Sequence, residues 1–332
     1  IEVPQGAIRL NTDSQKLEFF AQDRWYEFAT EEGTGLAGRA FRSAGETGPA
    51  GTVIETFNIT TTGNSHDTGF DLSQSTNEMG ASGSRTRAIL AGGYTGGGSG
   101  QTYIQYFEMT ALANSIDFGD LTVQMGRNTA HSNNSRCIIT GSVSNVNDVI
   151  NFITVASTGN AQDFGDCITN RETPAACGNR TRAIWGGGTG PSPYASRTDI
   201  DLVTIESTGN AIDFGDLTLA RYSPAALSNG VRGVWGSGVP GSPYAPLNTI
   251  DFATISSTGN AQDFGDLQVA TQNALTASNA TRGIFAGGGA PSRSSLISFI
   301  TISTRGDATA FGDLENVSGG YGGNCDSHGG VI

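Results

Sequence analysis

Hydrophobic and polar positions along most of the chain alternate in short runs separated by turn-forming residues. In residues 221–267, a short apolar segment ends at Ser228–Asn229, and VRGVWGSG then reads as a strand terminated by glycines. NTIDFATIS is the next strand, rich in β-branched and aromatic residues, and AQDFGDL follows the turn STGN as an outer strand. The pattern predicts one antiparallel sheet of four strands.

The second strand of this pattern carries apolar residues on both of its faces. Ile284, Phe285 and Ala286 stand in consecutive positions, so neither face of that strand is polar. A strand that is covered on both sides by neighbouring sheets has this composition. The pattern therefore predicts sheets that stack face to face.

The four-strand pattern recurs along the chain. The ten residues STGNAQDFGD occur at 157–166 and again at 257–266, with the near copy STGNAIDFGD at 207–216. Gly63, Gly159, Gly209 and Gly259 anchor the clear copies, and weaker copies lie at Ala113 and Gly306, at steps of 50, 46, 50, 50 and 47 residues. Six units of this length indicate a six-bladed β-propeller, with the repeated turns as scaffold.

The two ends of the chain supply complementary parts of one unit. The last unit stops at GGNCDSHGGVI, after its first strand only. GRAFRSAG at 38–45 resembles TRGIFAGG at 281–288, and TVIETFNITTTGN at 52–64 resembles NTIDFATISSTGN at 248–260. We expect the C-terminal strand to pair with the N-terminal part of the propeller, which closes the ring without a free sheet edge there.

The order of these motifs resembles the kelch repeat, with Ala220-Arg221 and Gly287-Gly288 at matching positions. Phenylalanine replaces the usual outer-strand tryptophan at Phe118, Phe164, Phe214, Phe264 and Phe311. The STGNAxDFGDL…SNxTRGIFxGG text and a terminal SHGG resemble, more specifically, repeat proteins of tailed phages, notably marine cyanophages. The resemblance covers about residues 38–330. It implies a kelch-like virion protein.

Residues 1–30 do not follow the repeat. Alternation in AIRLN and KLEFF around the turn NTDSQK predicts a hairpin, and RWYEF predicts a third strand. The pattern GxIRxNxxxxxLExxxxxxWxxF resembles a small module of phage tail-fibre and other virion proteins, which implies attachment or oligomerisation; the alternative is a packing hairpin alone. We expect a module over 1–30, a linker over 31–37 and the propeller over 38–332.

Composition and charge narrow the function classes. The 332 residues include 48 glycines, and the formal net charge is −13. Nucleic acid is a poor partner for such a chain, and no apolar run has the length of a membrane span, so we expect neither nucleic-acid binding nor membrane insertion. The four cysteines are irregularly spaced, which favours buried thiols over a disulfide framework. The chain opens without methionine, so the start was processed or the chain is part of a longer product.

Two charged columns recur with the repeat. The arginines are Arg39, Arg87, Arg136, Arg182, Arg232 and Arg282. The aspartates are Asp71, Asp120, Asp166, Asp216, Asp266 and Asp313. Catalysis does not need six copies of a pair, whereas a ring needs one joint at each interface, so we expect both columns to be structural. Our hypothesis is that the two columns meet as ion pairs.

Residues that break the repeat are the binding candidates. In a four-stranded blade, the loops after the second and fourth strands emerge on one face, and in this chain those loops differ from one another. Variable loops on a rigid scaffold commonly carry binding. Either contact with a ligand or simple cover of the blade tops explains a loop tyrosine. The candidates are Tyr94, Arg127, Arg171, Tyr194, Arg197, Tyr222, Tyr244 and Arg293.

Signatures of an enzyme are sparse. The histidines His66, His131 and His328 lie in unrelated units, and no GxxxxGK[ST] occurs, so we expect no metal site, no cofactor and no catalytic residue. Paired acids for glycoside cleavage remain open, because their separation is invisible in a sequence.

We interpret the chain as a non-enzymatic phage virion protein, located in the tail or a capsid appendage. It recognises a host-surface glycan or protein through the variable loops, and it binds other virion proteins through its N-terminal module. A homo-oligomer is expected, a trimer if the protein forms a fibre. The alternatives are a capsid or tail decoration or capping protein that contacts only virion proteins, which a flat apolar patch would favour, and a glycan-degrading propeller enzyme, which a groove with tyrosine and paired acids would favour.

Overall fold

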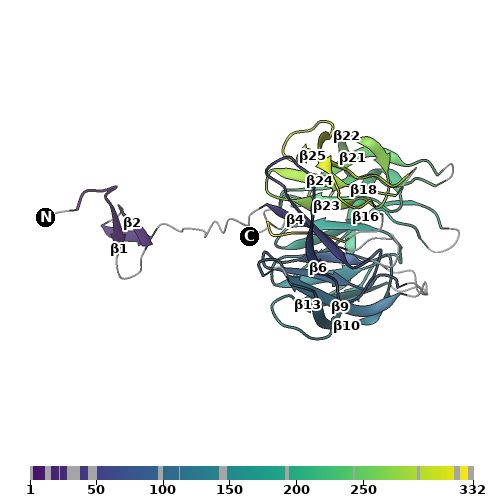
Figure 1. Cartoon of the computed structure of the whole chain (residues 1–332), viewed down its shortest axis with the longest axis horizontal. Helices are drawn as coiled ribbons and strands as arrows, with labels where there is room; N and C mark the ends of the chain where they lie inside the picture. Colours follow the sequence, from purple (N-terminus) through teal and green to yellow (C-terminus); the bar gives the residue numbers. More distant parts are fainter. Residues whose placement is uncertain are drawn as a thin grey trace. The chain divides into compact units, whose positions relative to one another are not determined.

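A computed structural model describes residues 3–11, 16–21, 23–27, 38–43, 51–95, 100–111, 113–141, 148–190, 194–241, 244–289, 292–317 and 322–327. The chain divides into two compact units, Ile1–Ala37 and Gly38–Ile332 (Figure 1). Every regular element of the described residues is a β-strand. These strands form seven small antiparallel sheets, so the prediction of an all-β, propeller-like chain is confirmed.

The first unit contains one three-stranded sheet with the order β1 (Ile8–Asn11), β2 (Lys16–Ala21) and β3 (Arg24–Glu27). Phe20 packs edge-on against Trp25, with ring centroids 5.2 Å apart. The Arg9 guanidinium lies 4.1 Å from the Trp25 ring centroid, and its Nε donates to Glu18 at 2.7 Å. Aromatic and cation–π contacts thus stabilise a sheet too small for a core of its own. The expected linker 31–37 lies outside the described residues.

The second unit, called the propeller-like unit below, contains six four-stranded sheets. The first three sheets are composed of β7 (Gly80–Gly83), β8 (Arg87–Ala91), β9 (Gln101–Glu108) and β10 (Ile116–Met125); of β11 (Thr129–Ser132), β12 (Arg136–Thr140), β13 (Val149–Thr154) and β14 (Gln162–Asp166); and of β15 (Ala175–Gly178), β16 (Arg182–Gly186), β17 (Arg197–Thr204) and β18 (Ile212–Arg221).

The other three sheets follow the same order. They are composed of β19 (Ala225–Ser228), β20 (Arg232–Gly236), β21 (Leu247–Thr254) and β22 (Gln262–Thr271); of β23 (Leu275–Ser278), β24 (Arg282–Ala286), β25 (Leu296–Thr301) and β26 (Thr309–Asp313); and of β27 (Gly322–Cys325), β4 (Arg39–Ser43), β5 (Val53–Asn58) and β6 (His66–Asp71). In the last sheet, the C-terminal strand β27 pairs with β4 from the start of the unit.

The first strands of the six sheets form a closed ring of contacts. Each of β7, β11, β15, β19, β23 and β27 contacts the next, and β27 also contacts β7. The apolar core lies between neighbouring sheets in six clusters; one joins Ile89 of β8 and Phe118 of β10 to Ile139 of β12 and Ile153 of β13. The consecutive apolar residues of each second strand are buried because a neighbouring sheet covers each face.

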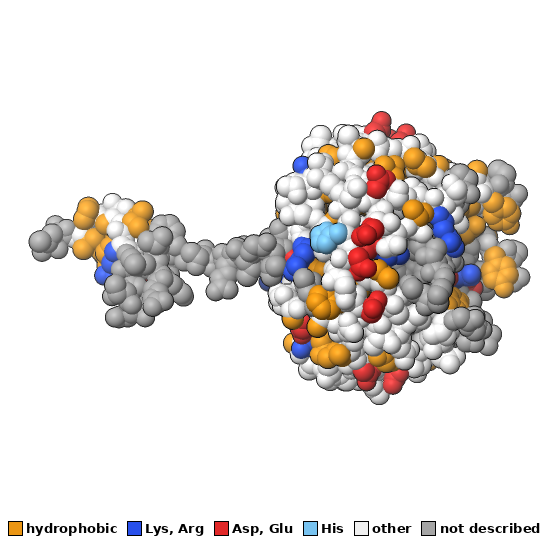
Figure 2. Space-filling model, viewed as in Figure 1, with side chains coloured by type: hydrophobic (Ala, Val, Ile, Leu, Met, Phe, Trp, Pro, Cys, Tyr) orange, Lys and Arg blue, Asp and Glu red, His pale blue; other side chains and the backbone are white. Residues whose placement is uncertain are grey.

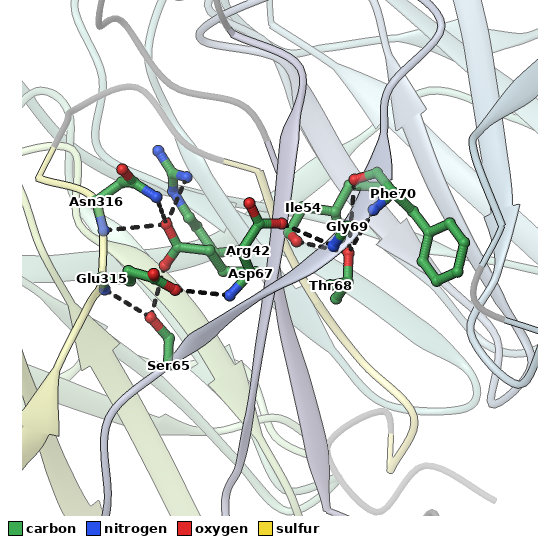
Figure 3. A network of polar contacts seen from close by, with 10 residues as sticks. Arg42, Ile54, Ser65, Asp67, Thr68, Gly69, Phe70, Glu315 and Asn316 are labelled. Carbon is green, nitrogen blue, oxygen red and sulfur yellow. Dashed lines mark hydrogen bonds and ion pairs between the residues drawn. The ribbon is translucent and has the colours of Figure 1, made fainter.

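Contacts between the first and the last segments of the propeller-like unit hold the closing sheet together. The Asp326 carboxylate, just after β27, accepts the backbone N–H groups of Gly38 and Arg39 at 2.8 Å each. Buried Glu55 on β5 accepts Arg42 Nη1 at 3.0 Å and the Asn316 side chain at 2.8 Å (Figure 3). Charged partners of this kind make up for the loss of hydration in a buried site. They tie three separate chain segments together at the closure.

The arginine column forms one set of joints between sheets. The guanidinium of each arginine, on the second strand of its sheet, donates to a carbonyl just after the third strand of the next sheet. These bonds run from Arg39 to Met109, Arg87 to Val155, Arg136 to Ile205, Arg182 to Ile255, Arg232 to Ile302 and Arg282 to Ile59, at 2.6–3.2 Å. Several of these guanidiniums also stack over an aromatic ring of the third strand, as Arg232 does over Phe252 at 4.7 Å.

The aspartate column forms a second, separate set of joints. Asp216 lies on the outer strand β18, where its N–H donates to the Asn260 side chain at 3.2 Å and its carbonyl accepts Ala261 N–H at 2.8 Å. The Gly259 N–H also donates to the Phe214 carbonyl at 2.7 Å. A TGN turn therefore docks on the FGD segment of the preceding sheet. The backbone N–H and the carbonyl of the aspartate make the same two bonds to the next repeat at Asp71, Asp120, Asp166, Asp266 and Asp313.

The hypothesis that the two columns meet as ion pairs is wrong. The arginines bind backbone carbonyls, and the carboxylates with a side-chain partner accept hydroxyl groups, as Asp120 does from Thr102 and Asp216 from Thr198. A carbonyl at the end of a strand lacks a partner in the ladder and therefore needs an external donor. The arginine column and the aspartate column instead form two separate sets of contacts between neighbouring sheets.

Candidate functional site

One end of the propeller-like unit carries the loops that differ between repeats. The loops after the second and fourth strands emerge there, and we call this end the variable-loop face. The SN and TGN turns emerge at the opposite end and are nearly uniform in sequence. Parts of the variable loops, namely 44–50, 96–99, 142–147, 191–193, 242–243, 290–291 and 318–321, lie outside the described residues.

Among the described residues, five occupy equivalent positions on the variable-loop face, each two residues before the first strand of a sheet. We call them the rim residues: Glu78, Arg127, Thr173, Ser223 and Asn273. All five have a left-handed backbone, with φ between 50° and 54°. Backbone bonds link neighbours around the ring, because each N–H of Thr173, Ser223 and Asn273 donates to the carbonyl of the preceding rim residue, at 3.0–3.2 Å.

The rim residues surround the mouth of an axial cavity of about 190 Å³. Below the rim, its wall is formed by small residues of the first strands, among them Ala81, Ala176, Ala226, Thr276 and Gly323. These residues leave space along the axis because short side chains project only slightly from the strands.

Two of the asparagines that line this cavity are buried, and the Asn128 amide is directed at the neighbouring sheet, where its Nδ2 donates to the Ala91 carbonyl at 3.0 Å. Asn128 Oδ1 and Asn324 Nδ2 lack a hydrogen-bond partner within the described part of the chain, and the two residues are only 7% and 5% exposed. An acceptor and a donor of this kind are costly to bury without a partner.

Arg127 is the centre of a charged cluster on the rim. Its Nε donates to Glu78 at 2.9 Å, and its Nη1 donates to Glu172 at 3.2 Å. Burial disfavours the charge of Arg127, but the field and hydrogen bond of Glu78, together with Tyr94 and Glu172, outweigh it, so the pKa of Arg127 is raised. The guanidinium lies 5.8 Å from the Tyr94 ring centroid, and burial raises the pKa of Tyr94 to about 12. Tyr94 therefore remains a neutral hydroxyl donor at neutral pH.

Tyr194 and Tyr244 are strongly exposed, at 64% and 68%. They stand in the SPYA segments of neighbouring repeats, fifty residues apart, and both have a left-handed backbone, with φ of 59° and 55°. Tyr222 is half-buried, and its pKa is raised by burial and by the neighbouring Tyr244.

The prediction of Arg171 as a surface contact is wrong. Its side chain is buried, with Nη2 donating to Asp201 at 2.7 Å and Nη1 to the Asp199 carbonyl at 2.8 Å. Burial raises the pKa of Asp201, and Arg171 opposes this shift. The pair joins one sheet to the next and is not available to a ligand.

Sequence reasoning missed the equivalent pair one repeat later. Arg221 Nη2 donates to Asp251 at 2.9 Å, and both side chains are fully buried. Arg171 and Arg221 are fifty residues apart, and each has an aspartate thirty residues further on, so comparison of repeat positions could have found both pairs. Of the remaining candidates, Arg197 is held by Asp199, with Nε donating at 2.8 Å, and Arg293 is exposed.

Acidic groups dominate the circumference. The outer-strand aspartates are exposed, and Figure 2 shows acidic side chains gathered in a row across the visible side of the propeller-like unit. Among the described residues, no group of three or more His, Cys, Asp or Glu side chains could hold a metal ion. The four cysteines are free thiols and are buried.

Comparison with known proteins adds no family assignment. No protein-family model and no curated protein matches this sequence. In the described part of the chain, no helix has the length and apolarity to cross a membrane.

Proposed function

We propose that the chain is a non-enzymatic virion protein of a tailed phage, and that its second unit is a six-bladed kelch-like propeller that recognises a host-surface glycan or protein. The variable-loop face is the recognition surface. The N-terminal unit binds other virion proteins and supports a homo-oligomer, a trimer if the protein forms a fibre. The resemblance of the repeated motifs to those of tailed-phage proteins supports the virion assignment.

The display of Tyr194 and Tyr244 carries the recognition proposal. A bulky residue with a left-handed backbone costs conformational free energy, and an exposed ring recovers little of it by burial. The fold alone gives no reason to keep two aromatic rings there. Tyrosine offers a flat face and a hydroxyl group with few rotatable bonds, which suits a sugar ring or a protein surface.

The experiment measures binding of the fluorescently labelled full chain to a panel of marine cyanobacterial strains. Each strain is tested before and after periodate oxidation, which cleaves the vicinal diols of surface polysaccharide. We expect saturable binding to at least one strain, and a large loss of binding in the double variant Tyr194→Ala, Tyr244→Ala. Ile212→Ser, at an exposed position of the outer strand β18, is the matched control.

The outcomes separate the proposal from its alternatives. Loss of binding after periodate identifies a glycan receptor, and binding that survives periodate identifies a protein receptor. Absence of binding by the folded, multimerised chain on every strain would refute host recognition and favour a decoration or capping role. Release of soluble sugar from the cells would instead indicate a glycan-degrading enzyme.

A further inference from the structure

The rim residues retain side chains where glycine would be less strained. Left-handed backbone is unfavourable for residues with a Cβ, and most of all for a β-branched residue such as Thr173. Elsewhere this chain places glycine at many positive-φ positions. Thr173 Oγ1 accepts the Ser223 N–H at 3.2 Å, and Arg127 is paired with Glu78 at 2.9 Å, so three of the five side chains also have contacts within the scaffold. The backbone bonds that link the ring need no side chain.

The rim side chains differ in chemistry although their backbones agree. Glutamate, arginine, threonine, serine and asparagine together provide both donors and acceptors around one opening. Paired donors and acceptors on a ring match a ligand that presents several hydroxyl groups, because each hydroxyl both donates and accepts.

Charge and size restrict the ligand further. Arg127 is the cation of the cavity lining, and Glu78 and Glu172 already neutralise it, so an anionic group gains little there. The volume of about 190 Å³ lies below the range of roughly 300–1,000 Å³ that whole drug-sized ligands occupy. The cavity therefore suits one small neutral unit and not an internal stretch of a polymer.

We infer that the mouth of the axial cavity binds the terminal neutral sugar of a surface glycan, and that the rim residues determine which sugar fits. This inference rests on the proposed function and specifies its ligand class and location. The exposed tyrosines then contact the rest of the glycan outside the cavity.

Saturation-transfer NMR on the full chain tests the inference, with the methyl glycosides of glucose, galactose, mannose and rhamnose as probes. Glucuronic acid is the anionic comparison. We expect saturation transfer to at least one neutral glycoside and none to glucuronic acid. The double variant Ser223→Gly, Asn273→Gly should raise the Kd about tenfold or more, as expected for the loss of two hydrogen bonds. Ile212→Ser should leave the Kd unchanged.

Glycine is the informative replacement because it fits the left-handed backbone. The double variant should therefore keep or raise the melting temperature while it loses the sugar. A variant that binds the sugar as tightly as the wild type would overturn the inference, as would saturation transfer to no neutral glycoside. If the chain still binds cells under either of these results, the inference fails and the proposed function stands. If the chain binds neither cells nor sugars, both fail.

Discussion

The joint between the TGN turn and the FGD segment provides a stringent test of the scaffold. A Cβ atom added at Gly215 would stand 2.5 Å from the carbonyl oxygen of Gly259 in the next repeat. This contact is between two backbones, so no side chain can move aside to relieve it. Gly215→Ala must therefore separate the two sheets at this joint.

The expected loss of stability follows from two contributions. Gly215 has φ of 146°, a region almost restricted to glycine, and alanine there costs about 1–3 kcal/mol. Separation of the joint also breaks up to three hydrogen bonds, the bonds from Gly259 N–H to Phe214, from Ala261 N–H to Asp216 and from Asp216 N–H to Asn260. At roughly 0.5–1.5 kcal/mol each, these bonds contribute about 2–4 kcal/mol.

Gly209→Ala is the matched control for backbone strain. Gly209 has φ of 155°, but a Cβ atom there would meet no atom within 4 Å. Urea unfolding should therefore rank the wild type above Gly209→Ala, and Gly209→Ala above Gly215→Ala by about 2–4 kcal/mol. Equal losses in the two variants would refute the close contact as the reason for glycine, and would leave backbone conformation as its only cause.

Three further predictions concern single side chains. Arg232→Met should lower the free energy of unfolding by about 1.5–3 kcal/mol, because the Ile302 carbonyl loses a charged donor; an unchanged urea midpoint would contradict this. Burial raises the pKa of Asp326, so this carboxyl stabilises the fold below its unfolded pKa and loses that contribution as pH rises through the folded value. The melting temperature of Asp326→Asn minus that of the wild type should therefore increase from pH 4 to pH 7. A difference that stays constant over this range would refute the prediction. Burial raises the pKa of Cys137 to about 12, so a thiol reagent at pH 8 should label it only after unfolding, and rapid labelling of the native protein would be inconsistent with this.

The architecture could be predicted because repetition makes the same local rules visible six times. Glycine and asparagine in each turn, and consecutive apolar residues in each second strand, indicate sheets that cover one another. The partner of a repeated side chain is less visible. Arg232 binds the Ile302 carbonyl, and a backbone acceptor leaves no mark on residue identity. An ion pair with the aspartate column was therefore the natural but incorrect reading.

The candidate site was less predictable, for a similar reason. Burial of Arg171 depends on its partner Asp201 in the next sheet, and position in a loop suggested exposure instead. All of the rim residues except Arg127 escaped notice because they share a backbone angle and not a residue type. A periodicity search looks for equal letters, and a residue such as Ser223 resembles ordinary loop sequence until its φ is known.

The uniform positions and the varied positions of each repeat thus have different roles. The uniform letters form the joints, since one geometry must recur at every interface between sheets. At the rim, that same geometry recurs with five different side chains, including Thr173, where the left-handed backbone is unfavourable. The turn itself does not require these side chains, because glycine also adopts the left-handed backbone. Our inference of a sugar at the cavity mouth accounts for these varied side chains and directs mutagenesis to the rim before the outer loops.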